Sequence, residues 1–267
     1  MSASTTSTDA CNDFHALHHS GTPLLLPNAW DYASAAILVN AGFGAIGTTS
    51  LGVAAAHGLR DGQGAARAET VALTRRLARL PCRLTVDIEA GFSTDPGEVA
   101  QLAAELAAIG AVGINLEDGR PDGTLASISQ QQELIATIKS QVPNLFLNAR
   151  TDVHWLALDD PQMADTLARV EAYRAAGADG IFVPGLADDD RIRTVVTSTD
   201  APVNILYLPG QHTVGRLAEL GVRRISYGSL LFRTAIAATA ATALAVARGE
   251  PLPEQVPSYV EVNQLAR

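Results

Sequence analysis

Lysine is almost absent from this chain of 267 residues: Lys139 is the only one, and the other 18 basic residues are arginines. It lies in the segment QQELIATIKSQ, whose apolar spacing predicts a helix that turns the ammonium group toward solvent. A Schiff-base aldolase needs a buried lysine, and a phosphate-binding P-loop needs the sequence Gly-Lys-Ser/Thr. Both classes of protein are therefore excluded.

Cysteine is also scarce, with Cys11 and Cys82 the only two. They have neither the spacing of a zinc site nor the number that a disulfide framework requires. This usage fits a reducing compartment, so we expect a cytoplasmic protein.

Excess positive charge and long apolar runs are missing as well. The formal net charge of −9 and the pI near 5.1 argue against binding to nucleic acid or to an anionic membrane surface. The longest apolar run, AIAATAATALAVA, lies between Arg233 and Arg248, which leave 14 uncharged residues between them, whereas a membrane-spanning helix needs about 20. Residues 1–20 show no basic segment followed by an apolar one, so we expect no secretory signal.

One sequence unit recurs four times: a helix end, a glycine, a short turn and an apolar β-like run. It occurs as NAGFGAIGTTS, AIGAVGINLED, AAGADGIFVPG and ELGVRRISYGS. A glycine at that point is typical of the left-handed residue that ends a helix. Together with further apolar runs, these units predict eight strands that begin near residues 24, 45, 83, 112, 145, 180, 203 and 224.

Helical patterns separate the predicted strands, as in DPGEVAQLAAELAAIG, where Asp95 and Pro96 form a typical helix start. Eight strands that alternate with helices over about 250 residues predict a (β/α)₈ barrel of the TIM type. A doubly wound sheet is the alternative, but no G-x-G-x-x-G sequence follows the first strand. We expect a single barrel domain over residues 13–267, preceded by a polar, disordered tail over residues 1–12.

Acidic side chains stand where two predicted strands end, in VDIEAGF and INLEDG. Side chains alternate along a strand, so Asp87 and Glu89 share a face, and Glu117 and Arg150 on the next strands point the same way. One interpretation is structural: a ring of ion pairs and turn caps, with Asp118 capping its glycine turn and Arg150 neutralising Glu117. The other is a magnesium site, because Mg²⁺ prefers oxygen ligands and needs only one or two direct carboxylates. Three carboxylates on neighbouring strands favour the second interpretation.

Six segments, in order and at barrel spacing, resemble the isocitrate lyase/phosphoenolpyruvate mutase superfamily: LPNAWDYASA, GTTSLGVAAAHGLRDGQ, VDIEAGF, VGINLEDG, FLNARTD and ADGIFVPG. The resemblance extends over most of the chain. It implies that Asp87 is the principal ligand of a Mg²⁺ ion, for which Mn²⁺ can substitute. It further implies that Asp61, Glu89 and Glu117 hold the ion largely through water.

The same resemblance implies a substrate site. Ser50, Leu51 and Gly52 would bind a substrate carboxylate through hydroxyl and backbone N–H groups, and Arg150 would bind its carboxylate or oxo oxygens. In this chemistry a 2-oxo acid that chelates Mg²⁺ loses a C–C or C–P bond and leaves an enolate, which metal and arginine stabilise.

Several further residues are candidates for the site. We expect Trp30 to form a wall of the substrate pocket and Asn204 to contact the substrate. Tyr207, at the end of the seventh strand, is a candidate proton donor, with simple packing as the alternative. His57 lies in a loop that can act as a lid. The remaining histidines near the N-terminus are expected to be solvated: His15, His18 and His19.

The loop after the fourth strand departs from the best-known members of the superfamily. Isocitrate and methylisocitrate lyases carry a K-[KR]-C-G-H motif there, and phosphonate-acting members carry a lysine and an asparagine. This chain has EDGRPDGTLASIS, without cysteine, lysine or histidine. It therefore resembles the short-loop members, which include oxaloacetate decarboxylases. We predict a Mg²⁺-dependent lyase of a small 2-oxo dicarboxylate, with C–P bond chemistry or a non-catalytic 2-oxo acid-binding barrel as alternatives.

The segment SLLFRTAIAATAATALAVARGE after the eighth strand predicts a long helix that is apolar on nearly every face. Packing on its own barrel would cover only one of those faces. The resemblance implies that this eighth helix is exchanged between subunits and that the protein is a homotetramer, a dimer of helix-exchanged dimers. The alternative is a monomer in which the C-terminal segment covers the outer face.

Overall fold

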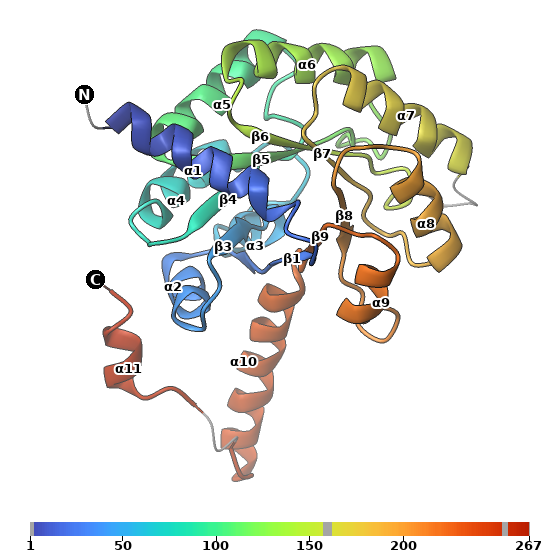
Figure 1. The fold of residues 1–267 in the computed structure, drawn as a ribbon. Helices are drawn as coiled ribbons and strands as arrows, with labels where there is room; N and C mark the ends of the chain where they lie inside the picture. Colours follow the sequence, from blue (N-terminus) through green and yellow to red (C-terminus); the bar gives the residue numbers. More distant parts are fainter. Residues whose placement is uncertain (1–2, 157–161, 253–255, 267) are drawn as a thin grey trace.

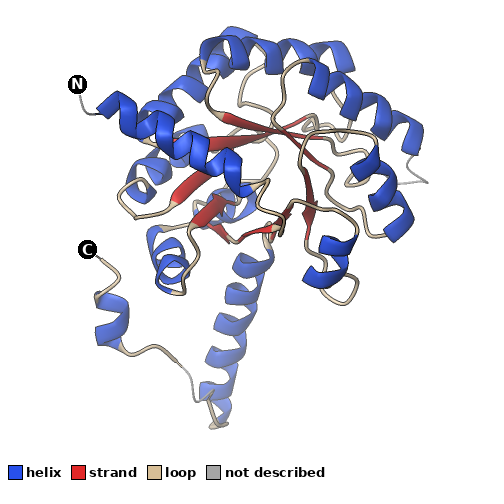
Figure 2. Ribbon diagram, in the orientation of Figure 1, coloured by secondary structure: helices blue, strands red, loops and turns tan. Residues whose placement is uncertain are grey.

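Parallel strands form a barrel at the centre of the molecule, and helices surround it (Figures 1 and 2). The computed structural model describes residues 3–156, 162–252 and 256–266. Within these ranges the strands are β1 (Leu24–Leu26), β2 (Asn28–Ala29), β3 (Ala45–Thr48), β4 (Arg83–Asp87), β5 (Ala111–Glu117), β6 (Phe146–Arg150), β7 (Gly180–Phe182), β8 (Val203–Leu206) and β9 (Arg224–Ser226). Each lies at a predicted strand, so the predicted (β/α)₈ barrel is confirmed.

The first barrel strand is divided in two at Pro27, which has no backbone N–H to donate. Its first part, β1, pairs with β9, and its second part, β2, pairs with β3. The remaining strands pair in sequence order from β3 to β9. The two parts of strand one therefore join the ends of the sheet and bring it close to a closed barrel.

Helices follow the strands as the sequence predicts. They are α2 (Tyr32–Asn40), α3 (Ser50–Ala56), α4 (Arg67–Leu77), α5 (Pro96–Ile109), α6 (Ile128–Gln141), α7 (Met163–Ala175), α8 (Asp189–Thr197), α9 (Val214–Glu219), α10 (Leu230–Arg248) and α11 (Tyr259–Asn263). The predicted start of α5 is confirmed, since the Asp95 side chain accepts a hydrogen bond from the Glu98 backbone N–H. The four glycines predicted to end helices all have positive φ: Gly42, Gly110, Gly177 and Gly221.

The N-terminal segment differs from the predicted disordered tail over residues 1–12. Residues 3–17 form the helix α1 (Ala3–Leu17), which packs on the starts of β5 and β6 (Figure 1). Phe14 is fully buried, and its ring meets that of Phe146 edge-on at 5.4 Å between centroids. His18, expected in solvent, is buried and stacks on Phe146 at 4.2 Å. The helix covers the amino-terminal ends of the strands at the bottom of the barrel, where it buries apolar side chains such as Val112 and Phe146.

Helix α10 is the predicted long apolar helix, and it extends away from the barrel (Figure 1). None of its residues is buried in the single chain, and contact with the barrel is made near its start, where the Phe232 ring lies 5.3 Å from that of Trp30. An 18-residue stretch of this 19-residue helix has a mean hydropathy of 1.7, so by length and composition alone the helix could cross a membrane. The helix is longer than the uncharged run counted in the sequence because it begins before Arg233.

Candidate active site

A cavity of 70 Å³ lies at the carboxyl ends of the barrel strands. Of the predicted site residues it is lined by Ser50, Leu51, Asp61, Asp87 and Arg150. These come from four separate stretches of the chain, which the parallel strands bring to one rim. The rest of the lining consists of Asn28, Thr48, Thr49, Asn115, Trp155, Phe182, Pro184, Leu206, Ser226, Gly228 and Ser229.

Ser50 and Leu51 are positioned by the start of α3. The first N–H groups of a helix have no partner within the helix, so they are available to an anionic ligand. The Thr49 side chain makes no capping hydrogen bond to them. This geometry supports the predicted role of the segment in binding a carboxylate.

Arg150, the last residue of β6, is held by charged groups on two sides. Its Nη1 lies 2.7 Å from Glu117 Oε2, and its Nε donates to Asp152 Oδ1 at 2.6 Å. The guanidinium carbon also lies 6.0 Å from the ring centre of Trp155 and 5.7 Å from that of Phe182. Burial by itself favours the neutral arginine, but the carboxylates, first of all Glu117, raise the pKa of Arg150 above its ordinary value. The side chain is therefore a fixed cation at the cavity wall.

Three carboxyl groups lie at the same end of the barrel as this arginine: Glu89 and Glu117, which are buried, and Asp87, which is half-buried. Burial raises the pKa of each, although Arg150 opposes the effect at Asp87 and Glu117. For Glu89 the pKa rises to about 7. Repulsion from Asp61 adds to the shift at all three. Removing these groups from water is costly unless a cation compensates them.

These residues fit a divalent cation. Glu89 is 2% exposed, its Oε2 accepts from the Gly64 N–H at 2.9 Å, and its Oε1 has no partner among the described residues. Glu89 and Glu117 border a second cavity, of 560 Å³, whereas Asp61 and Asp87 face the smaller one. In the described part of the chain no three acidic, histidine or cysteine side chains are close enough to chelate an ion together. An ion here would thus be held by few direct ligands, the others acting through water, as the resemblance implies.

The other predicted site residues do not line the 70 Å³ cavity. Gly52 lies against Trp30, since an added Cβ would come within 2.7 Å of the Trp30 Cβ. Asn204 is fully buried inside the barrel, and the Tyr207 ring lies 6.3 Å from that of Tyr227. His57 Nδ1 donates to the Val53 carbonyl at 2.9 Å, within its own helix turn. Their proposed contacts with substrate stay predictions.

Sequence reasoning missed the aromatic walls of the cavity. Trp155 and Phe182 flank Arg150. Sequence reasoning also missed Ser226 and Ser229, which line the cavity from the end of β9. Each follows or ends a strand, which is the signal that could have found it. Residue type gave no indication, because tryptophan, phenylalanine and serine are common in many surroundings.

Residues 14–247 match the family described as phosphoenolpyruvate phosphomutase. The chain belongs to this family. Membership confirms the resemblance to the isocitrate lyase/phosphoenolpyruvate mutase superfamily that the sequence motifs indicated. An uncharacterised protein of Mycobacterium tuberculosis is 42% identical over 94% of both chains. An oxaloacetate decarboxylase of Pseudomonas savastanoi is 28% identical over 86% of this chain and 82% of its own.

Solved structures of the superfamily share the fold. A proposed phosphonomutase from Burkholderia cenocepacia is 38% identical, with a TM-score of 0.82 over 87% of this chain and 98% of its own. A phosphonopyruvate hydrolase in complex with oxalate and Mg²⁺ is 23% identical, with a TM-score of 0.84 over 96% and 94% of the two chains. At that identity the second likeness shows the fold alone.

Proposed function

We propose that this member of the phosphoenolpyruvate mutase family is a cytoplasmic, Mg²⁺-dependent lyase that decarboxylates oxaloacetate or a similar small 2-oxo dicarboxylate. The observation that carries the proposal is a fixed guanidinium, Arg150, that pairs with Glu117 and lines a small cavity together with Asp61 and Asp87. The 70 Å³ volume favours a compact acid over an extended cofactor. The oxaloacetate decarboxylase among the relatives supports the same substrate class.

Each side chain has a distinct task in this scheme. Asp87 would hold the metal ion directly, and Asp61, Glu89 and Glu117 would hold it through water. When bound, the ion supplies a Lewis acid for the 2-oxo group. The Glu89 Oε1, which has no partner among the described residues, and the repulsion among these carboxyl groups support this assignment.

Arg150 and the start of α3 position the substrate. The guanidinium of Arg150 donates to the carboxylate or oxo oxygens and stabilises the negative charge of the enolate. The Ser50 hydroxyl and the adjoining N–H groups hold the remaining carboxylate. Because the arginine is already fixed by Glu117 and by Asp152, little reorganisation is needed during the reaction.

The short loop after β5 fits decarboxylation. Carbon dioxide leaves without a proton, and water can protonate the enolate, so the loop needs no catalytic acid. Tyr207 remains the candidate for a donor from the protein. The loop folds as a small hairpin, in which Gly119 pairs with Leu125 and the Arg120 N–H donates to the Thr124 carbonyl.

Phosphonate chemistry is the second candidate function, favoured by the likeness to the proposed phosphonomutase. Assays of oxaloacetate and phosphonopyruvate with Mg²⁺, side by side, separate the two. We expect turnover of oxaloacetate and little activity on phosphonopyruvate. Stabilisation by oxalate without turnover of any 2-oxo acid would instead indicate a binding protein.

Replacing the principal ligand tests the metal role. Asp87→Ala should abolish turnover, lowering kcat by at least about 10³-fold, while the circular dichroism spectrum stays unchanged. Asp190→Ala, at an exposed carboxylate that pairs with Arg193 on the surface, is the matched control and should keep full activity. Turnover that survives both Asp87→Ala and EDTA would show that the ion has no role.

A further inference from the structure

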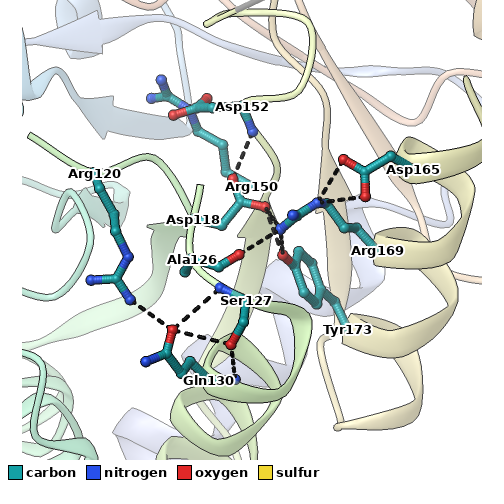
Figure 3. Close-up of polar contacts among 10 residues, drawn as sticks. All are labelled: Asp118, Arg120, Ala126, Ser127, Gln130, Arg150, Asp152, Asp165, Arg169 and Tyr173. Atoms are coloured by element: carbon teal, nitrogen blue, oxygen red, sulfur yellow. Dashed lines mark hydrogen bonds and ion pairs between the residues drawn. The ribbon is translucent and has the colours of Figure 1, made fainter. Parts of the chain in front are cut away.

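Asp118 is a buried carboxylate that the proposed reaction does not use. It follows Glu117 at the end of β5 and has no exposed surface. Its Oδ2 accepts from the Tyr173 hydroxyl at 2.6 Å and from Arg169 Nη1 at 3.0 Å (Figure 3). Its Oδ1 accepts from the backbone N–H of Asp152 at 2.8 Å. The structural interpretation of the sequence expected Asp118 to cap its own glycine turn. The side chain instead bonds with these distant residues.

Asp152 connects this carboxylate to the active site. Its Oδ1 accepts from Arg150 Nε at 2.6 Å, so Asp152 and Glu117 together hold the guanidinium in place. Its Oδ2 lies against the α-carbon of Gly119, where any added Cβ would collide with it. Asp152 is therefore held at its backbone by Asp118, and Gly119 leaves the space that its carboxylate occupies.

Arg169 and Tyr173 anchor the network in helix α7. Arg169 is 7% exposed and Tyr173 is fully buried, and the Arg169 Nη1 donates to the Tyr173 hydroxyl at 3.0 Å. The same Nη1 donates to the Ala126 carbonyl at 2.9 Å, at the far end of the β5–α6 loop. Its Nε contacts both oxygens of Asp165 at 3.2 Å. One guanidinium thus ties α7 to both ends of that loop.

We propose that Asp118, held by Arg169 and Tyr173, is a positioning residue that sets the orientation of Arg150 through Asp152 and thereby its affinity for the substrate oxygens. None of Asp118, Arg169 and Tyr173 lines the 70 Å³ cavity, although Asp118 borders the 560 Å³ cavity, so each reaches Arg150 through other residues. The inference rests on the proposed function, in that Arg150 is taken to bind substrate. A buried charge or polar group is costly when it loses its partner. Any movement that breaks a contact of this network is therefore unfavourable, and the arrangement is rigid.

Substitutions at three residues perturb the network at different points. Tyr173→Phe removes one donor to Asp118 and is the mildest. Arg169→Gln removes the buried cation, and Arg169→Lys restores the charge. Gly119→Ala pushes directly on the Asp152 carboxylate. The matched control is Asp200→Asn, which breaks the exposed ion pair of Arg174 on the same helix.

Binding of oxalate, a planar dianion that resembles an enolate of a 2-oxo acid, provides the first readout in the presence of Mg²⁺. We expect its Kd to rise about 10-fold in Arg169→Gln and Gly119→Ala, as is typical for partners that orient a binding group, and about 3-fold in the milder Tyr173→Phe. Arg169→Lys should recover part of the loss, and Asp200→Asn should bind as the parent protein does.

The emission of Trp155 provides a second readout that needs neither substrate nor metal. Trp155 lies 6.0 Å from the Arg150 guanidinium, and Trp30 is the only other tryptophan. In a Trp30→Phe background, a displaced Arg150 should change the Trp155 emission of the free protein in the same three variants. Emission spectra and oxalate affinities that match the control, together with a lowered Tm, would reduce the network to a stabilising role and overturn the proposal. If the parent protein fails to bind oxalate, the proposed function fails, and unchanged Trp155 emission in the variants would overturn the positioning role separately.

Discussion

At the scale of single residues, the surroundings of Arg150 contain features of both interpretations of the sequence, the ion pair and the acidic metal site. Arg150 does pair with Glu117, at 2.7 Å, as the structural interpretation expected. In the part of the chain that the structure describes, Glu89 has no such cation, because the charged groups that act on its pKa are Asp61 and Asp87, which repel it. The surplus of negative charge is what the proposed metal ion would balance.

His18 allows a prediction about pH. The ring is buried, its Nδ1 donates to the Phe14 carbonyl at 2.8 Å, and burial together with Arg224 lowers its pKa to about 3. The ordinary pKa of histidine, which applies to the unfolded chain, is 6.5. Between pH 6.5 and pH 3 the unfolded state therefore binds a proton at this ring and the folded state does not. Stability from this residue is complete above pH 6.5 and is lost as the pH falls toward 3, by about 1.4 kcal/mol per pH unit.

Urea unfolding at pH 8 and pH 5 measures this loss. From pH 8 to pH 5 the free energy of unfolding of the parent protein should fall by about 2 kcal/mol more than that of His18→Gln, which lacks the ring. His19→Gln, at an exposed ring, is the control and should follow the parent. Equal losses in all three proteins would show that His18 does not couple folding to protons.

At the scale of elements, the seam of the barrel depends on Asn28. Its Nδ2 donates to the Thr48 carbonyl at 2.8 Å, and its Oδ1 accepts from the N–H groups of Tyr227 and Gly228 at 2.9 and 2.8 Å. The side chain thereby joins β2 to the ends of β3 and β9. Pro27 divides the strand beside it, so the amide supplies hydrogen bonds where the ladder is interrupted.

Removing this amide should weaken the closure of the barrel. Asn28→Ala removes the partner of the Gly228 N–H, whereas the Tyr227 N–H keeps a 3.3 Å contact with the Leu26 carbonyl, and we expect a loss of about 2–4 kcal/mol in the free energy of unfolding. Urea unfolding monitored by circular dichroism measures it, with Asn40→Ala at an exposed helix end as the control. A change below about 0.5 kcal/mol would show that the ladder alone holds the seam.

At the scale of the whole molecule, α10 presents an apolar surface that the single chain does not cover. Ile236, Leu244 and Val246 are 56%, 52% and 63% exposed, and none of the helix is buried. A helix that is apolar on most faces is stable in water only when those faces are buried. We propose that a second copy buries them by exchange of this helix, in a homotetramer.

Light scattering at micromolar concentration tests the assembly. We expect about four times the 27.9 kDa chain mass, and Leu244→Glu should shift the protein toward smaller species. A monomer, or a truncation at Gly228 that stays soluble and folded, would contradict the proposal. Recovery of the chain in the membrane fraction would contradict it too and would assign α10 to a bilayer.

The sequence by itself determined the order of the elements and the rim on which the site lies. Strand positions follow from local apolar runs, helix ends follow from glycines such as Gly110, and Asp87 and Arg150 were found because parallel strands end at one edge. These are local or short-period signals, so one strand can be recognised without knowledge of the next.

Only the tertiary structure decided which side chains meet. Asp118 bonds with Tyr173, 55 residues away, Asn28 with Gly228, 200 residues away, and Phe14 with Phe146. Helix α1 was missed for this reason: its own residues are weakly apolar, and its stability comes from strand starts far along the chain. Pairing across such distances depends on the closed barrel, because closure, rather than any local pattern, brings those segments into contact.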